Sequence, residues 1–286
     1  MTAGREHYLG CAVDSRFVEL ATAMLASVNA NGQVPDVCVV VAAFGLSSRQ
    51  KRLIRRYAGE LGRKLQFVDV DSTCAELKGL QVSRDYSASI YGKVLLPGLI
   101  GKSAGRLVCL DSDMIVNHSL AHLFTMPMDG HPLAAVRDHI DPEQLARRSR
   151  APDPNYFNAG LMVIELQPWI EQRISDRTFA VLRSGARPLF WPEQDALNEV
   201  LGPDWKRLER AWNFYYGGGS EHLVFEDYQA AHIVHFTGTP KPNSPACRHP
   251  AGTFYRHHAR RPKRQGPAWV ERALEQLRAW RPKSPT

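Results

Sequence analysis

Arg106-Leu-Val-Cys-Leu-Asp111-Ser-Asp113-Met-Ile115 is the stretch of the sequence that decides the fold. Its first five residues are mostly apolar and predict a β-strand, and two carboxylates follow at once, Asp111 and Asp113. In open α/β sheets, ligands bind beyond the carboxyl ends of the strands. Two carboxylates held together there repel each other unless a cation joins them, and their hard oxygen atoms suit an octahedral Mg²⁺ or Mn²⁺. The stretch therefore predicts an α/β sheet whose edge carries a metal site.

Two other interpretations of the aspartate pair stay open. Both carboxylates could simply cap the turn that follows the strand. The pair could also be the D-x-D motif of a haloacid dehalogenase-type phosphatase, in which the first aspartate is the nucleophile. That class carries the motif on its first strand, with Thr or Val two residues after the second aspartate. Here the strand is the fourth and the residue is Ile115, so the phosphatase is the weaker alternative.

Strands and helices alternate before this stretch, and shorter strands follow it. Such alternation predicts right-handed βαβ crossovers and a mostly parallel sheet flanked by helices, which is an α/β fold. The expected strands are His7–Val13, Asp36–Phe44, Leu65–Val70, Arg106–Leu110, Leu133–Val136, Ala159–Glu165 and His232–Phe236. The expected helices are Phe17–Asn29, Ser47–Leu61, Ser87–Leu96, Pro168–Ser184 and Gln194–Leu201.

The length and composition fit one soluble globular domain, alone or with a small appendage. A chain of 286 residues buries a sizeable core without disulfides, and 44% hydrophobic with 23% charged residues is ordinary for a globular protein. No stretch approaches the ~20 apolar residues of a membrane span, and the polar segment Met1–His7 does not begin a signal peptide. The five cysteines are scattered, as in a reducing compartment. We expect a cytoplasmic protein and leave open its peripheral attachment to the inner face of the membrane.

The basic charge is concentrated at the C-terminus. Residues 254–286 hold nine basic and two acidic residues, so this segment alone accounts for the net charge of +7. We expect a catalytic domain over 1–245 and an appendage over 246–286, made of a linker rich in Pro, His and Arg and an amphipathic helix with Trp269 and Trp280 on one face. Basic residues with aromatics predict binding to an anionic membrane surface, unless the tryptophans pack on the body. Nucleic acid is not an expected partner, because no nucleic-acid module accompanies the charge.

A second motif, IVHFTGTPK at 233–241, can complete the metal site. A strand delivers His235, whose neutral imidazole is a good ligand for Mn²⁺. Gly238 lets the backbone approach a phosphate closely, and Lys241 supplies a point charge to it. The alternative is a partly buried core histidine with a surface lysine.

Two further segments carry polar groups suited to a sugar. In YFNAG at 156–160, the asparagine is expected on a turn before a buried strand, where its amide can exchange hydrogen bonds with hydroxyls. In WPEQD at 191–195, polar side chains open a helix at its electropositive end. The alternatives are an ordinary turn for the first segment and helix capping for the second.

Four motifs, taken together and in this order, resemble those of glycosyltransferase family eight. They are LDSD at 110–113, YFNAGLMVIELxxW at 156–169, EQDALN at 193–198 and HFTGxxKP at 235–242. The family includes bacterial lipopolysaccharide galactosyl- and glucosyltransferases and glycogenin, and the resemblance runs from about His7 to about Lys241. It implies a GT-A-type fold, a UDP-sugar donor and Mn²⁺, with Mg²⁺ as the other candidate metal.

The resemblance also implies which residues bind the metal and the diphosphate. Asp111, Asp113 and His235 match the metal ligands of the family. Gly238 and Lys241 match the clamp on the diphosphate.

The nucleotide end of the donor is implied to lie at the end of the first strand. There Asp14 would contact the uracil, next to Ala12. Lys93 matches the basic residue that touches the donor, and Ser112, between the two aspartates, counts with the donor-binding residues.

The sugar end of the donor is implied to lie against the second and third motifs. Asn158, Glu193 and Gln194 match residues that hold the transferred sugar, and Asp138 matches a position towards the sugar or the acceptor. Glu193, Gln194 and Lys241 are the catalytic candidates.

The implied activity is that of a retaining transferase, which moves glucose or galactose to a hydroxyl of a saccharide or a lipid-linked glycan. Because Gln194 is a poor nucleophile, front-face attack by the acceptor is favoured, with the departing phosphate oxygen as base; a covalent intermediate on Glu193 stays open. The family more often has Asp at Glu193 and Trp at Asn243, which leaves the donor sugar open. The acceptor is expected against the loops Arg147–Asn155 and Tyr215–Ser220. An inactive sugar-nucleotide-binding or membrane scaffold is the alternative outside enzymes.

Overall fold

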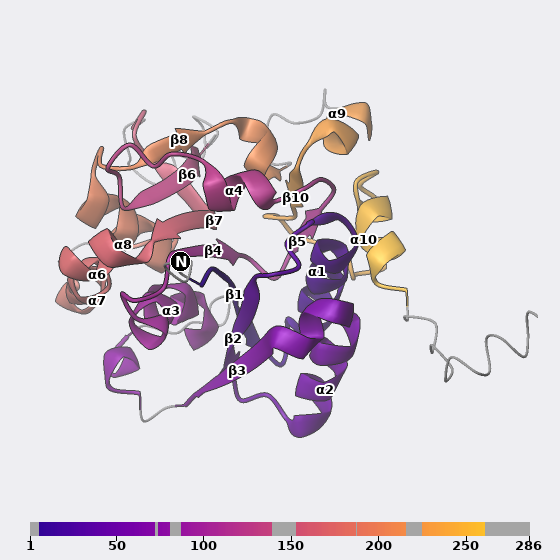
Figure 1. The fold of residues 1–286 in the computed structure, drawn as a ribbon, viewed down its shortest axis with the longest axis horizontal. Coiled ribbons are helices and arrows are strands. Elements are labelled where there is room, and N and C mark those ends of the chain that lie inside the picture. Colours follow the sequence, from indigo (N-terminus) through magenta and orange to yellow (C-terminus); the bar gives the residue numbers. More distant parts are fainter. Residues whose placement is uncertain are drawn as a thin grey trace, which may run out of the picture.

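The computed structural model describes residues 6–71, 74–80, 87–138, 153–186, 188–215 and 225–260. The strands of its central sheet are β1 (Tyr8–Asp14), β2 (Cys38–Phe44), β3 (Leu65–Val70), β4 (Arg106–Leu110), β6 (Leu133–Arg137), β7 (Phe157–Glu165) and β8 (Lys206–Leu208). Their order is β3-β2-β1-β4-β7-β6-β8 (Figure 1). Pairing is parallel from β3 to β4, antiparallel from β4 through β7 to β6, and parallel between β6 and β8. The expected mostly parallel α/β sheet is therefore confirmed.

Helices cover both faces of this sheet. They are α1 (Val18–Asn31), α2 (Ser48–Tyr57), α3 (Gly92–Ile100), α4 (Ala121–Thr125), α6 (Leu166–Glu171), α7 (Ile174–Ser184), α8 (Pro192–Leu201), α9 (Phe225–Ala230) and α10 (Gly252–His258), with 3₁₀ turns at Gly59–Lys64, Ala75–Leu77, Ala88–Tyr91 and Arg210–Asn213. In β2, Val39 and Val41 pack with α1 and α2, whereas Val40 and Ala42 pack with α3, on the side that α6, α7 and α8 also cover (Figure 1). Burial on both faces explains why β2 is apolar along its length. Within the described residues, no helix combines the length and the apolar character that crossing a bilayer requires.

A second, smaller sheet carries the residues that follow the aspartate pair. Its strands are, in order, β5 (Met114–Val116), β10 (Ile233–His235) and β9 (Phe214–Tyr215). β5 and β10 are antiparallel, and His235 is the pairing partner of Met114. Because Met114 directly follows Asp113, this register brings the histidine to the aspartates. A shift by one residue would turn its side chain to the other face of the sheet.

Three predicted helices change type or are divided in the structure. The segment 47–61 forms α2 as far as Tyr57 and then a 3₁₀ turn from Gly59, whose φ is 57°. The segment 87–96 forms a 3₁₀ turn and then α3, which continues to Ile100. The segment 168–184 forms parts of α6 and α7, because Arg173 between them has a left-handed backbone with a φ of 54°. A left-handed residue cannot continue the hydrogen-bond ladder of a right-handed helix. The prediction of helix is therefore confirmed for 87–96, whose first turn is 3₁₀, whereas the prediction of one continuous helix is wrong for 47–61 and 168–184.

The segment 240–267, expected to be a linker, contains α10. Tyr255 of this helix is buried in a small apolar cluster with Leu20 of α1. The linker prediction is therefore wrong for residues 252–258, which pack on the folded body. The amphipathic helix expected around 269–280 lies outside the described residues, so the division of the chain at residue 245 stays a prediction.

Candidate functional site

The ends of β4 and β10 bring three ligating side chains together. One ligand atom from each of Asp111, Asp113 and His235 lies within 4.8 Å of the others. The imidazole Nε2 is 3.3 Å from Asp113 Oδ1 and 3.7 Å from Asp111 Oδ2. In the described part of the chain this is the only group of three such side chains. Two carboxylates and one imidazole form a donor set that suits Mn²⁺, and the expected convergence of these residues is confirmed.

A lysine neutralises one oxygen of each aspartate. Lys93 Nζ donates to Asp111 Oδ1 at 2.6 Å, and Lys241 Nζ donates to Asp113 Oδ2 at 2.6 Å. The other oxygen of each carboxylate lies towards His235. Each aspartate is therefore oriented by a lysine on one side and can bind a cation with the other.

Burial and charge act against each other on these groups. Burial would raise the pKa of Asp113, but Lys241 and His235 outweigh it and hold this pKa well below its usual range. Burial would lower the pKa of Lys93, which is 3% exposed, but the charge of Asp111 outweighs it and raises the pKa. Asp113 is therefore a carboxylate and Lys93 a cation at neutral pH.

Strand β7 makes room for the imidazole at Gly160. This glycine adjoins the aspartates, because its carbonyl accepts a hydrogen bond from the backbone N–H of Asp111 at 2.9 Å. A Cβ atom built on it would lie 2.3 Å from Cε1 and 2.7 Å from Nδ1 of His235, and 2.9 Å from Asn158 Oδ1. Such distances are far inside van der Waals contact. Any side chain at this position therefore displaces the ring.

Asp138, directly after β6, collects the side chains expected to bind the sugar. Gln194 Nε2 donates to Asp138 Oδ2 at 2.8 Å, and Asn158 Nδ2 donates to the same atom at 3.5 Å. The hydroxyl of Tyr215 donates to the other oxygen. Asn158 lies inside β7, where it pairs with Val136 of β6, so its predicted place on a turn is wrong. The carboxylate thus fixes the direction of both amides.

Glu193 lies in the first turn of α8, directly before Gln194, and is nearly buried. Its side chain is 14% exposed, and Oε1 is 4.0 Å from Lys93 Nζ. Burial raises the pKa of this carboxyl to about 7, with Lys93 lowering it and Asp111 raising it further. At neutral pH the carboxyl is therefore partly protonated.

The predicted nucleotide-binding residues lie at the end of β1. Asp14 accepts hydrogen bonds from the backbone N–H of Arg16 at 2.8 Å and from the hydroxyl of Ser87. Burial would raise the pKa of Asp14, but these hydrogen bonds outweigh it and lower the pKa. Ser112 Oγ donates to the carbonyl of Ala12 at 3.0 Å, which ties the turn between the aspartates to this strand end.

The loop after β10 carries the two remaining predicted positions. A Cβ atom on Gly238 would meet nothing within 4 Å, so open space adjoins this residue. Asn243, where an aromatic residue is more usual, is exposed and donates to Glu19 at 3.2 Å. The loop therefore leaves room at the glycine three residues before Lys241.

Comparison with known proteins decides the family. The sequence pattern described as "Glycosyl transferase family 8" matches residues 9–243. The chain belongs to this family. It is 25% identical over 265 residues to General stress protein A of Bacillus subtilis (strain 168), covering 88% of this chain and 92% of that protein. It is 26% identical over 192 residues to the lipopolysaccharide 1,2-glucosyltransferase of Escherichia coli (strain K12), covering 63% of this chain and 56% of that protein.

A solved structure confirms the fold of this family 8 chain. The galactosyltransferase LgtC, in complex with donor and acceptor sugar analogues, superimposes with a TM-score of 0.73 at 20% sequence identity. The match covers 93% of this chain and 99% of that one. The expected GT-A fold is therefore confirmed, and family membership places the aspartate pair in a glycosyltransferase rather than in a dehalogenase-type phosphatase.

Three side chains of the site in this family 8 protein were not predicted individually, although Tyr156 lies in the YFNAG motif and Tyr215 begins an expected acceptor loop. Tyr156 accepts a hydrogen bond from Gln194 Nε2 at 3.1 Å, and Tyr215 binds the carboxylate described above. Asn213 is fully buried and contacts His235. The sequence feature that could have identified Asn213 is its place inside the aromatic run WNFY at 212–215. Such a run is expected to be buried, and a buried amide must find hydrogen-bond partners.

In the segment WPEQD at 191–195, one side chain caps the helix and another belongs to the sugar-side cluster. Asp195 accepts hydrogen bonds from the backbone N–H groups of Phe190 and Trp191 at 2.8 and 3.2 Å, which is the capping alternative. Gln194 instead reaches the sugar-side cluster and also accepts from the backbone N–H of Ala159 at 2.9 Å. The loops expected to bind the acceptor lie mostly outside the described residues, which include only 153–155 of the first and residue 215 of the second.

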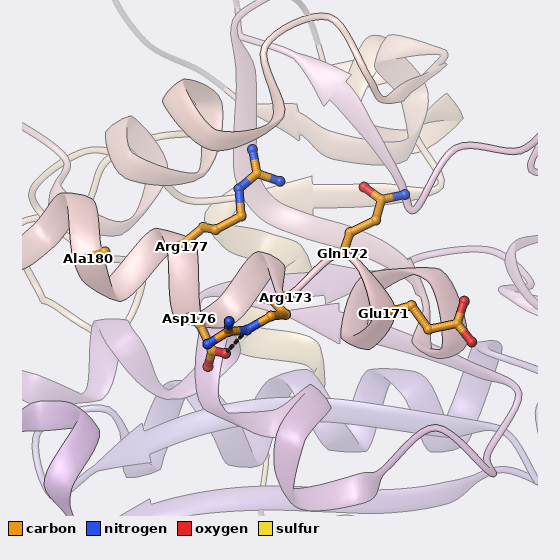
Figure 2. A pocket seen from close by; sticks show the side chains of 6 residues that line it. All are labelled: Glu171, Gln172, Arg173, Asp176, Arg177 and Ala180. Atoms are coloured by element: carbon orange, nitrogen blue, oxygen red, sulfur yellow. Dashed lines mark hydrogen bonds and ion pairs between the residues drawn. The ribbon is translucent and has the colours of Figure 1, made fainter.

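A surface depression lies elsewhere, between α6 and α7 (Figure 2). It is lined by Glu171, Gln172, Arg173, Asp176, Arg177 and Ala180, none of which is a predicted site residue. Figure 2 shows the side chain of Arg173 paired with Asp176. Its charges are mixed and its side chains do not converge on one point, so it does not form a second site.

We expect Gly160→Ala to weaken metal binding at least tenfold, because the new methyl group displaces the imidazole of His235. Titration of the purified protein with Mn²⁺, followed by electron paramagnetic resonance of the free ion, measures the loss. Gly98→Ala is the control, since a Cβ there meets nothing within 4 Å and alanine favours the helix. Native affinity in Gly160→Ala would show that the ring does not bind the metal in this place.

Proposed function

We propose that this chain is a retaining glycosyltransferase, which moves glucose or galactose from a UDP-sugar to a hydroxyl of a saccharide or lipid-linked glycan. The observation that carries the proposal is the convergence of Asp111, Asp113 and His235 at the carboxyl end of β4, with a lysine paired to each aspartate. Mn²⁺ is the proposed metal, with Mg²⁺ as the second candidate. The lipopolysaccharide 1,2-glucosyltransferase among the relatives, and the sugar analogues bound to LgtC, support the substrate class.

The chemistry requires a diphosphate to leave from the anomeric carbon with its negative charge stabilised. A divalent cation held by the two aspartates and the histidine neutralises that charge when bound. Lys241 is a cation 2.6 Å from Asp113, and Gly238 adjoins open space, so this loop can accept phosphate oxygens. Lys93 contributes a second fixed positive charge, paired with Asp111.

We assign the two ends of the donor to opposite ends of the site. Asp14, with Ala12 and Ser112 beside the same strand end, is the proposed contact for the uracil, because a carboxylate kept ionised accepts hydrogen bonds from its N–H group. Asn158, Glu193 and Gln194 are the proposed contacts for the sugar, with Asp138 facing the sugar or the acceptor.

Front-face attack is the mechanism that the side chains favour. Both ends of the Gln194 amide are engaged, by Ala159 N–H and by Asp138, so this side chain orients and does not react. Glu193 is partly protonated at neutral pH, which makes it a weak nucleophile. The acceptor hydroxyl then attacks on the face from which the diphosphate leaves, and its proton passes to the departing phosphate oxygen.

We expect Asp113→Asn to reduce Mn²⁺-dependent UDP-sugar turnover by at least about 10³-fold, because the amide removes a ligand charge and the partner of Lys241. Release of UDP from UDP-glucose and UDP-galactose measures it, with and without saccharide acceptors. Asp69→Asn, which breaks an exposed pair with Lys51, is the control. Full turnover in Asp113→Asn, or native turnover in the presence of EDTA, would contradict the proposal. The absence of any turnover in the native protein would favour a binding scaffold.

We expect Glu193→Gln to keep turnover within about tenfold of the native value, since front-face attack uses no nucleophile on the enzyme, whereas loss of a nucleophile costs far more. Turnover on the preferred donor measures it, and mass spectrometry of the native protein looks for a glycosyl adduct. A fall to background in the variant, together with an adduct on Glu193 in the native chain, would establish the covalent mechanism instead.

We further propose that the basic C-terminal segment, residues 254–286, binds an anionic membrane surface. Ala259, directly after α10, meets the end of α2, where the hydroxyl of Tyr57 donates to its carbonyl at 3.5 Å. The last turn of α2 carries Arg55 and Arg56, both exposed, so basic residues from two parts of the chain lie near Ala259. Each basic residue near such a surface contributes about 1 kcal/mol.

We expect removal of residues 261–286 to abolish sedimentation with phosphatidylglycerol vesicles at low salt, because most of the basic residues of the tail are lost. The cut falls after α10, so Tyr255 stays buried and the fold is kept. Phosphatidylcholine vesicles and high salt are the controls for charge. Equal sedimentation of the full and shortened chains would show that the tail does not bind the membrane, and would favour the alternative in which it packs on the protein body.

A further inference from the structure

We propose that Asn213 is a positioning residue, which fixes the tautomer of His235 for metal binding and links this ligand to Asn158 on the sugar side. The inference rests on the proposed function and deepens it. Asn213 ends the 3₁₀ turn before β9, is fully buried, and lies between the two side chains that it connects.

The direction of every amide in this chain of hydrogen bonds follows from one backbone group. The N–H of Gly160 donates to a side-chain atom of Asn158 at 2.9 Å. A backbone N–H can only donate, so that atom must be the oxygen, Oδ1. Asn213 approaches the same oxygen at 2.8 Å and must therefore present its amide nitrogen, Nδ2. The amide nitrogen of Asn158 points the other way, towards the carboxylate of Asp138, which can only accept while ionised.

The protonation of the imidazole follows in turn. With its nitrogen committed to Asn158, Asn213 presents Oδ1 to the ring, and this oxygen lies 2.8 Å from Nδ1 of His235. An amide oxygen only accepts, so Nδ1 must carry a proton. Nε2, the atom that faces Asp111 and Asp113, is then the nitrogen left to give its lone pair to a metal. A hydrogen bond to the non-ligating nitrogen is how proteins orient metal-binding histidines.

The turn that holds Asn213 is itself anchored. Trp212 stacks on His232 with ring centroids 4.0 Å apart and an angle of 8° between the planes. The backbone N–H of His232 donates to the carbonyl of Ala211 at 2.8 Å. Both contacts tie the 3₁₀ turn to the residue that directly precedes β10. The amide is therefore held at a set place beside the strand that carries His235.

The test is Mn²⁺ affinity, measured by paramagnetic resonance of the free ion in the full chain without nucleotide. We expect Asn213→Ala to lose about 10–100-fold, the usual loss when the partner of a metal-binding histidine is removed. Asn213→Asp should recover part of that affinity, because one oxygen again accepts from Nδ1–H while the other cannot donate to Asn158 Oδ1. Asn158→Ala should cause a smaller loss, since it frees the amide of Asn213 to turn. The double variant of 158 and 213 should be no weaker than Asn213→Ala, because the first residue acts through the second.

Asn117→Ala is the matched control. Its amide donates to the carbonyls of Tyr228 and Ala231 at 2.9 and 3.2 Å and touches no ligating side chain, so it should lower the melting temperature and leave Mn²⁺ affinity unchanged. Long-range ¹⁵N–¹H spectra of the native chain should show a proton on Nδ1 of His235. A bare Nδ1, or equal affinity in the native chain and Asn213→Ala, overturns the inference alone. A native chain that does not bind Mn²⁺ overturns the proposed function instead.

Discussion

The pairing of β5 with β10 is the constraint on which the site depends. Only three residue pairs join these strands, yet they set the position of His235 opposite Met114, next to the second aspartate. Strands this short do not hold a register by themselves. The register is stabilised by burial, since Ile115 and Val234 pack with α1, α9 and α10 in one apolar cluster. The chemistry of the metal site thus depends on helices that contribute no ligand to it.

Two lysines balance the negative charge of the aspartate pair. Two aspartates alone at a buried sheet edge would repel each other and favour protonation. Lys93 and Lys241 each take one carboxylate oxygen, so the four groups are formally neutral together. Because the lysines also donate to backbone carbonyls, at Ala159 O and Phe236 O, they are held and cannot swing freely. The site is therefore organised before any ligand binds, which is the arrangement that electrostatic catalysis requires.

Local sequence patterns predicted the parts of the fold that depend on local rules. The apolar strand before Asp111 and the alternation around it were enough for the class of sheet and for the edge at which the site lies. The division at Arg173 was beyond such rules, because an arginine in a left-handed conformation has no distinctive sequence signal. Helix α10 was hidden by a composition rich in Pro, His and Arg, and only tertiary burial of Tyr255 explains it.

The residues of the candidate site likewise fall into those that local motifs predict and those that depend on distant contacts. Side chains that lie in ordered motifs, such as Asp113 and Gln194, were found from the sequence. Asn213 was not, because its partners are 22 and 55 residues away and no spacing rule connects them. Asn158 was found but placed on a turn, since NAG reads locally as a turn and only its pairing with β6 shows that the strand begins earlier.

The missing side chain at Gly160 has a consequence for how such a protein can diverge. The ring of His235 occupies the space in which a Cβ atom of residue 160 would stand. Positions 160 and 235, 75 residues apart in the chain, therefore cannot vary independently: a larger residue at the first is compatible only with a smaller or differently placed one at the second. A descendant that lost the histidine would be released from the need for glycine, whereas one that keeps it must also keep glycine, because the imidazole fills the space of a side chain there.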